Sequence, residues 1–230
     1  MPEWQPETFR QRVTKLSDSL RGVSSRRKAV VAFAKHHQLI YFQSVPQDSE
    51  SVPVIRGSTV SPDQVDANYC IGSHADYDMA FVERTSRIAH EGFKTTMHRW
   101  YVLQIDLRTA QNLPFIFVGT RQQTKAYYAQ VLTTHREIRY LSLDSASPKS
   151  ASFHSHYALL ASPAELPALY RLFTDEMIDT MATHHYPFAI EIDGDSLTVI
   201  TEAIKPSQQL LDKLLHYGLW VAKAVDSRLA

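Results

Sequence analysis

The sequence predicts an α+β fold in which a mainly antiparallel sheet carries helices packed on one face. Apolar residues alternate with polar ones through the middle of the chain, while both ends show helical spacing. Strands and helices do not alternate strictly, as a parallel sheet would require. With 230 residues, of which 44% are hydrophobic and 21% charged, the chain is typical of a globular protein with one core. We therefore predict a single domain over residues 1–230, with a basic helical segment at 1–45 and a sheet-and-helix core at 50–230.

Two short amphipathic helices are predicted at the amino end. In the first, which Gly22 ends, apolar residues recur at spacings of four, three and four. They are Phe9, Val13, Leu16 and Leu20. The second begins at Ser24 or Ser25, since serine is a favoured helix cap. Its buried face consists of Val30, Phe33, Ala34 and His37. Pro53 and the polar residues within Gln47–Val54 then indicate a loop.

Strands are predicted between Val52 and Leu143, where the apolar period changes to two. The clearest is Thr95–Leu107, with Met97, Tyr101 and Leu103 on one side. The other strands are predicted at residues 67–71, 77–88, 114–118 and 137–143. Short connections between successive strands indicate an antiparallel meander. A helix is predicted from about Thr120, because Thr120 and Gln123 have the spacing of a capping box.

The carboxy-terminal third predicts the order strand, helix, hairpin, helix. The strand is Phe153–Leu160, and the first helix begins at Ser162, with Pro163 at its first position. The helix has an apolar stripe that reaches Met181. The pair Asp193-Gly194 predicts a tight hairpin turn in which both residues adopt positive φ. The last helix starts near Pro206 and buries a stripe that ends at Val225.

Four stretches of the sequence are distinctive, and they are Phe153–Tyr157, Leu172–Met177, Ile192–Val199 and Ala34–Tyr41. Together they resemble a bacterial family of domains whose function is unknown, although His37-Gln38 replaces the glycine that the family has there. The resemblance covers about two thirds of the chain and implies a shared fold. Many members carry transmembrane helices ahead of this domain, which this chain lacks. The family supplies no catalytic residues.

The charge pattern gives one candidate binding region. The chain has 24 basic and 24 acidic residues, so its overall charge does not favour nucleic acid as a partner. Residues 1–40, however, contain eight lysines and arginines against three acidic residues, a surplus of five positive charges. Arg26, Arg27 and Lys28 are the candidate binding residues. This region either presents a solvated face, docks on the acidic remainder or binds an anionic partner.

Cysteine content and hydropathy predict a cytoplasmic protein. Cys70 is the only cysteine, so an internal disulfide and a paired-cysteine zinc site are excluded. We expect a buried structural thiol. No segment has the roughly 18 apolar residues of a membrane span, and the amino end does not resemble a signal peptide. The seven glycines do not form a phosphate-binding loop, and the serine-hydrolase and zincin motifs are absent. No cofactor is predicted.

Two histidine clusters are candidate metal sites. His74, Asp76 and Asp78 lie within nine residues of one another and of Cys70, although a strand followed by a polar turn explains the same pattern. His154 and His156 are expected on one face of the predicted strand, where they could share an ion or merely border the core. We predict that they do not bind metal. Acidic residues near Asp175 fit a solvated helix face.

These patterns leave the function open. The leading hypothesis is a non-enzymatic binding or protein-interaction domain, because no nucleophile, base and orienting group occur in a recognisable order. The alternatives are a metal-dependent hydrolase that uses the histidines and aspartates above, or a sensor with a small-ligand pocket between sheet and helices. The partner is an unknown protein or small ligand. Neither enzymatic activity nor oligomeric state follows from the sequence.

Overall fold

The structure is a computed structural model that describes residues 25–44, 59, 64–89, 95–123, 125–143, 148–184, 187–203 and 205–229. The helix predicted from Phe9 to Leu20 and the loop predicted at Gln47–Val54 lie outside these residues. Residues 25–36 are helical, which confirms the second predicted helix.

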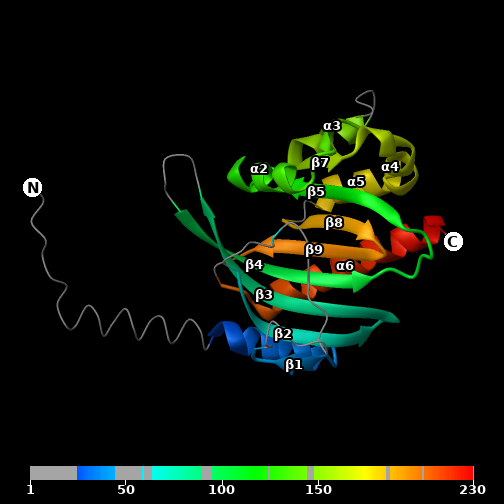
Figure 1. Ribbon diagram of the computed structural model, residues 1–230. Coiled ribbons are helices and arrows are strands. Elements are labelled where there is room, and N and C mark those ends of the chain that lie inside the picture. Colours follow the sequence, from blue (N-terminus) through cyan, green and yellow to red (C-terminus); the bar gives the residue numbers. More distant parts are fainter. Residues whose placement is uncertain are drawn as a thin grey trace, which may run out of the picture.

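One antiparallel sheet organises the described part of the chain (Figure 1). Its nine strands lie in the order β1-β2-β3-β4-β9-β8-β5-β7-β6, and each pairing is antiparallel. The strands are β1 (Ile40–Phe42), β2 (Val65–His74), β3 (Tyr77–Ala89), β4 (Thr95–Asp106), β5 (Leu113–Thr120), β6 (Arg139–Leu141), β7 (Tyr157–Ala161), β8 (Ala189–Gly194) and β9 (Ser196–Glu202). The α+β class and the antiparallel sheet are therefore confirmed.

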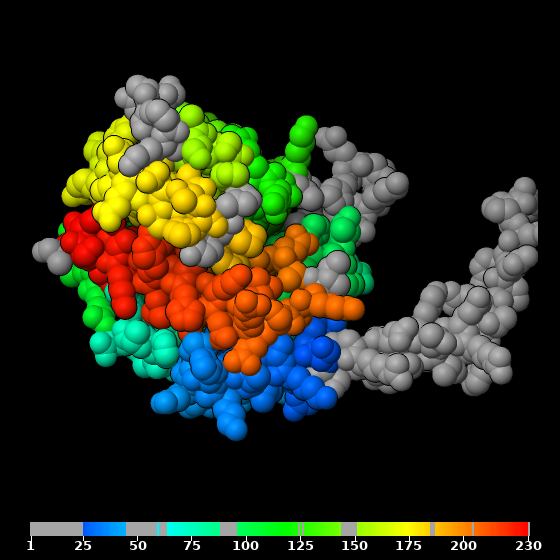
Figure 2. Space-filling model, turned by 180° about the vertical axis from the view of Figure 1, so that it is seen from behind, coloured from blue at the N-terminus to red at the C-terminus, as the bar shows by residue number. Residues whose placement is uncertain are grey.

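Most of the helices cover one face of the sheet. Helical residues 25–36 and α3 (Pro148–His156), α4 (Leu166–Leu172), α5 (Asp175–His184) and α6 (Gln208–Leu229) contribute to a single buried cluster with the inward residues of the strands. Figure 2 shows this side, where α6, in orange and red, runs between yellow α4 and α5 and the blue helical residues 25–36. The glycine at position 218 lets α6 approach closely, because a Cβ there would lie 2.9 Å from the Cδ1 of Ile105.

The opposite face carries the remaining helix, α2 (Lys125–Thr134). Tyr127 from α2 contacts Trp100 and Phe117, with ring centroids 5.9 and 6.0 Å apart, in a second buried cluster. The prediction of helices on one face is therefore wrong for α2. Trp100 and Val102 alternate with inward Tyr101 and Leu103, so β4 is apolar on both faces and needs cover on both.

The carboxy-terminal hairpin is present, but its turn is shifted by one residue. Asp193 pairs with Ser196, so the two turn residues are Gly194 and Asp195. Of these two, only Gly194 has positive φ, at 63°. This is the arrangement of a type II′ turn, in which glycine at the first central position is sufficient.

The helix predicted from Ser162 is divided into three parts. A 3-10 turn (Pro163–Glu165) precedes α4, and α5 begins at Asp175 after an interruption at Phe173 and Thr174. Ser162 precedes the first turn as predicted, but its side chain makes no capping hydrogen bond. Phe173 leaves helical geometry, with ψ at 71°, and its side chain is buried. The apolar stripe is therefore continuous although the helix is not.

Candidate functional site

The residues of the first predicted metal cluster lie apart from one another at the end of β2. His74 shares a strand face with buried Cys70, and its ring lies 4.9 Å from the ring of His37. Asp76 is in the β2–β3 turn with φ at 62°, and its side chain is 93% exposed. Asp78 projects from the opposite face of the sheet, where it accepts a hydrogen bond from Ser73. These side chains point in three directions and do not form one ion site.

Cys70 has the environment of a structural thiol. Its side chain is completely buried in the helix-covered core. Burial raises the pKa of the thiol to about 12. The predicted burial of Cys70 is confirmed, and the thiol is overwhelmingly protonated at neutral pH.

His154 and His156 lie on a helix, so their predicted position on one face of a strand is wrong. Residues 153–156 complete α3, and β7 begins only at Tyr157. Two residues along an α-helix are about 200° apart around its axis, so the two imidazoles diverge. His154 Nε2 accepts a hydrogen bond from the backbone N–H of Leu143 at 3.1 Å. Burial lowers the pKa of His154, with the charge of Arg121 acting in the same direction.

A different group of histidines is brought together where the helical residues 25–36 end. His37 is buried, and its Nε2 lies 2.8 Å from Asp212 Oδ1 on α6. The rings of His36, His74 and His216 surround it, with centroids 4.7, 4.9 and 6.3 Å away. Burial lowers the pKa of His37, although Asp212 opposes the shift. Within the described ranges, no three His, Cys, Asp or Glu side chains are placed to hold a metal ion together.

The candidate binding residues at the amino end have different positions. Arg27 and Lys28 are exposed, whereas Arg26 is only partly exposed and its Nε lies 3.4 Å from Glu83 Oε1 on β3. Arg99 on β4 approaches the same oxygen, with its Nε at 3.0 Å. The solvated-face interpretation therefore fits Lys28, whereas Arg26 contacts Glu83 and Arg27, although exposed, hydrogen-bonds Tyr41 on β1.

Glu83 is the centre of a polar cluster beneath the helical residues 25–36. Its second oxygen accepts a hydrogen bond from Asn68 Nδ2 at 2.6 Å, and Asn68 Oδ1 accepts one from Tyr41 at 2.7 Å. Asn68 has φ at 54° in an irregular stretch of β2, a conformation that asparagine tolerates better than most residues. Tyr101 is paired with Glu83 across the strands, and its buried hydroxyl makes no hydrogen bond within the described residues. We call Arg26, Asn68, Glu83, Arg99 and Tyr101 the Glu83 cluster.

Sequence reasoning missed four of these five residues, all except Arg26. One signal was present. Glu83 is an even number of residues from buried Met79 and Phe81, so the alternation of side chains in a strand places its carboxylate on the core side of β3. A buried carboxylate requires charged or hydrogen-bonding partners, and those partners come from other segments of the chain.

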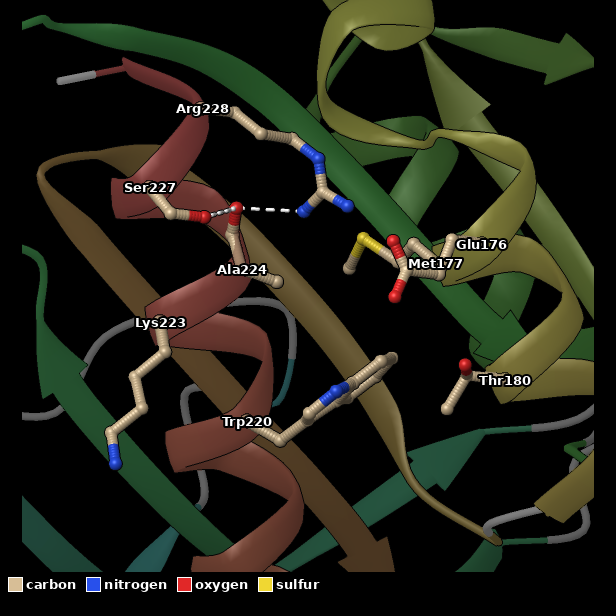
Figure 3. Close-up of a pocket in the computed structure, with 8 residues that line it drawn as sticks. All are labelled: Glu176, Met177, Thr180, Trp220, Lys223, Ala224, Ser227 and Arg228. Carbon is tan, nitrogen blue, oxygen red and sulfur yellow. Dashed lines mark hydrogen bonds between the residues drawn. The ribbon is translucent and has the colours of Figure 1, made fainter.

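A cleft of about 370 Å³ lies between α5 and α6 (Figure 3). Its apolar surface comes from Trp220 and Met177, and Arg228 and Glu176 face each other across it. Arg228 is held in place because its Nη1 donates to Ala224 O at 2.7 Å and its Nη2 to Thr174 Oγ1 at 2.8 Å. The side-chain carboxylate of Glu176 makes no hydrogen bond or ion pair with a described residue. The cleft therefore presents an apolar wall and two opposite charges that do not neutralise each other directly.

A second cleft, of about 330 Å³, lies on the other face of the sheet. Its polar residues include Ser73, Asp78, Gln104 and Asp106. Burial raises the pKa of Asp106, and the charges of Asp195 and Asp78 add to the shift. The cleft is acidic, and among the described residues that line it no cationic side chain balances these carboxylates.

Two comparisons with known proteins, by family model and by curated sequence, give no relative. A scan against protein-family models found no match for this chain, and a search of curated proteins found none either. The resemblance to a bacterial family of unknown function therefore stays a prediction. Among the helices that the structure describes, none combines the length and hydropathy needed to cross a membrane.

Proposed function

We propose that this chain is a non-enzymatic binding domain whose cleft between α5 and α6 holds a small zwitterionic ligand, an amino acid with an apolar side chain. The carrying observation is the opposed pair of Arg228 and Glu176 beside the Trp220 wall. A carboxylate, an ammonium group and an apolar group would each meet a matching partner there. The cleft volume lies within the range of small-ligand sites.

The arrangement of Arg228 supports recognition of a carboxylate. Its two hydrogen bonds restrain the guanidinium, yet each Nη retains a further N–H. A restrained donor loses little conformational entropy when a ligand binds. Lys223 also belongs to the cleft lining, but its ammonium group points away from the cleft in Figure 3. Arg228 is therefore the cation best placed for a ligand carboxylate.

The test is a titration of the Trp220 indole N–H resonance with phenylalanine, assigned by comparison with the Trp220→Phe protein. Phenylalanine should shift this resonance saturably. Phenethylamine lacks the carboxylate and phenylacetate lacks the ammonium group, so each should bind at least about tenfold more weakly, as one lost charge-assisted hydrogen bond predicts.

Two variants separate recognition from general apolar binding. In Arg228→Gln, phenylalanine should bind no better than phenethylamine, and in Glu176→Gln no better than phenylacetate. Arg171→Gln, an exposed change on α4, is the matched control and should leave the affinities unaltered. Equal binding of phenylalanine and phenethylamine by the unmodified protein would exclude the proposed ligand class.

A further inference from the structure

The Glu83 cluster has more hydrogen-bond donors than its residues use. Arg26 and Arg99 both approach Glu83 through Nε. Within the described part of the chain, the Nη atoms of these two arginines make no hydrogen bond. Each guanidinium therefore keeps two NH₂ groups for another acceptor.

Tyr101 adds a buried donor to this surplus. Its side chain is completely buried, its ring stacks on Phe81 with centroids 6.3 Å apart, and its hydroxyl makes no hydrogen bond among the described residues. Tyr101 pairs with Glu83 across the strands, and Arg99 lies two residues before it on the same face of β4, so the phenol is a neighbour of both charged groups. Leaving such a group unsatisfied costs about 1–3 kcal/mol, and native proteins do so rarely.

The charge around this cluster is positive. Among the described residues at this place, Arg26, Arg99 and Arg27, which hydrogen-bonds Tyr41, carry three positive charges against the one carboxylate of Glu83. The local surplus is therefore two. A phosphate monoester carries about −1.5 to −2 at neutral pH and has three strong acceptor oxygens, so it matches the surplus better than a monocarboxylate does.

The cluster is open to solvent on the arginine side. The side chains of Arg26 and Arg99 are 19% and 24% exposed, whereas that of Glu83 is 8% exposed. Glu83 lies at the base, with its Oε1 3.4 Å from the Nε of Arg26 and 3.0 Å from the Nε of Arg99. These are ion-pair contacts, and the buried Nε of Arg99 makes no hydrogen bond among the described residues. The Nη groups of both arginines are therefore the part available to an incoming anion. This is the arrangement of a pre-positioned pair of donors.

We propose that Arg26 and Arg99, with the hydroxyl of Tyr101 beneath them, form a binding site for a phosphate group between the helical residues 25–36 and the sheet. The site is separate from the α5–α6 cleft and does not depend on the function proposed for it. Because Arg26 belongs to the helix and Arg99 to β4, a bound phosphate joins these two elements and stabilises their contact.

The experiment measures the affinity of the full chain for inorganic phosphate and for O-phosphoserine by calorimetry, at constant ionic strength, with acetate as the monocarboxylate. Both phosphate compounds should bind, and acetate should bind at least tenfold more weakly. Tighter binding of O-phosphoserine would identify a monoester as the ligand, whereas tighter binding of inorganic phosphate would identify the free anion.

Three variants locate the binding. Arg99→Gln should weaken phosphate binding at least tenfold, and Tyr101→Phe should weaken it about three- to tenfold, because each removes a donor. Arg171→Gln makes the same change of charge on α4, at the far end of the molecule from helical residues 25–36 (Figure 1), and should bind phosphate as the unmodified protein does.

Three outcomes would overturn the proposal. They are equal binding of acetate and phosphate, an equal loss in Arg171→Gln, and undiminished phosphate affinity in Tyr101→Phe. The last variant keeps the ring that stacks on Phe81, so it remains informative even if Arg99→Gln does not fold. A water molecule that satisfies the Tyr101 hydroxyl would also give undiminished affinity and would count against the site.

Discussion

Glu83 and Arg84 are neighbours on β3, and each is the centre of a buried polar network on its own face of the sheet. On the α2 side, Arg84 is completely buried and binds both oxygens of Asp66, at 2.8 and 2.7 Å, and the hydroxyl of Thr59 at 3.1 Å. On the other side, Glu83 attracts two arginines that contact it only through Nε. In the first network, the guanidinium forms a bidentate pair with a carboxylate. In the second network, the arginines keep N–H donors that make no hydrogen bond among the described residues.

This difference separates a structural role from a binding role. A buried charge costs least when its donors are paired inside the protein, and in the Arg84 network each guanidinium nitrogen donates a hydrogen bond. The Glu83 cluster instead keeps its glutamate satisfied and its arginine Nη groups available. Substitutions should therefore destabilise the protein strongly at Arg84 and only moderately at the Glu83 cluster.

The largest effect is expected for Arg84→Met. The change leaves Asp66 without its bidentate partner, although its 17% exposure allows partial hydration. We expect a loss of about 3 kcal/mol in the free energy of unfolding, at the lower end for a broken buried pair. Urea denaturation measures it, with the exposed Arg171→Met as control. A loss below about 1 kcal/mol would show that the closed network is not structural.

A moderate effect is expected for Glu83→Gln. The amide cannot balance Arg26 and Arg99, but these side chains are partly exposed and water can solvate them. The free energy of unfolding should fall by about 1–2 kcal/mol, less than for Arg84→Met. The same denaturation experiment tests the order of the two variants. The comparison between the networks fails if Glu83→Gln is the more damaging one.

The smallest effects are expected for a pair of tyrosines, one on each face. Tyr128 belongs to α2 and is buried against the sheet, where its hydroxyl donates to Thr120 O at 2.7 Å. The hydroxyl of Tyr101, on the other face of the sheet, makes no hydrogen bond among the described residues. Tyr128→Phe should cost about 1 kcal/mol. Without phosphate, Tyr101→Phe should cause no loss of stability and a gain of up to about 1 kcal/mol, because it removes a buried hydroxyl that has no hydrogen-bond partner among the described residues. Thermal unfolding in a phosphate-free buffer measures both, and equal losses would mean that Tyr101 has a partner.

The sequence predicted the local elements better than their assembly. Apolar alternation located β4, and the glycine at position 194 located the β8–β9 hairpin, because both depend on neighbouring residues. Residues 153–156 were assigned to a strand because alternation over four residues does not distinguish a strand from the end of a helix. The place of β9 between β4 and β8 depends on contacts about a hundred residues apart, which no local pattern contains.

The candidate sites show the same limit. Arg26 was found because it belongs to a visible run of basic residues, but the partners that give it a role lie on β3 and β4. His74 was grouped with Asp76 and Asp78 because they are close in sequence, whereas the structure places it against His37. Successive residues in a strand point to opposite faces of the sheet. Two polar residues that are close in the sequence of a strand can therefore lie on opposite faces as easily as on the same face.

The position of β9 between β4 and β8 affects how the chain folds during its synthesis. Until residues 196–202 have left the ribosome, strand β4, which is long and has an apolar run from Trp100 to Leu103, has an open edge. Pairing across such a sequence separation closes slowly, and an open edge can recruit a strand from another nascent chain. Nascent chains that end before residue 196 should therefore bind chaperones persistently, and release should follow synthesis of β9 and the α6 that covers it.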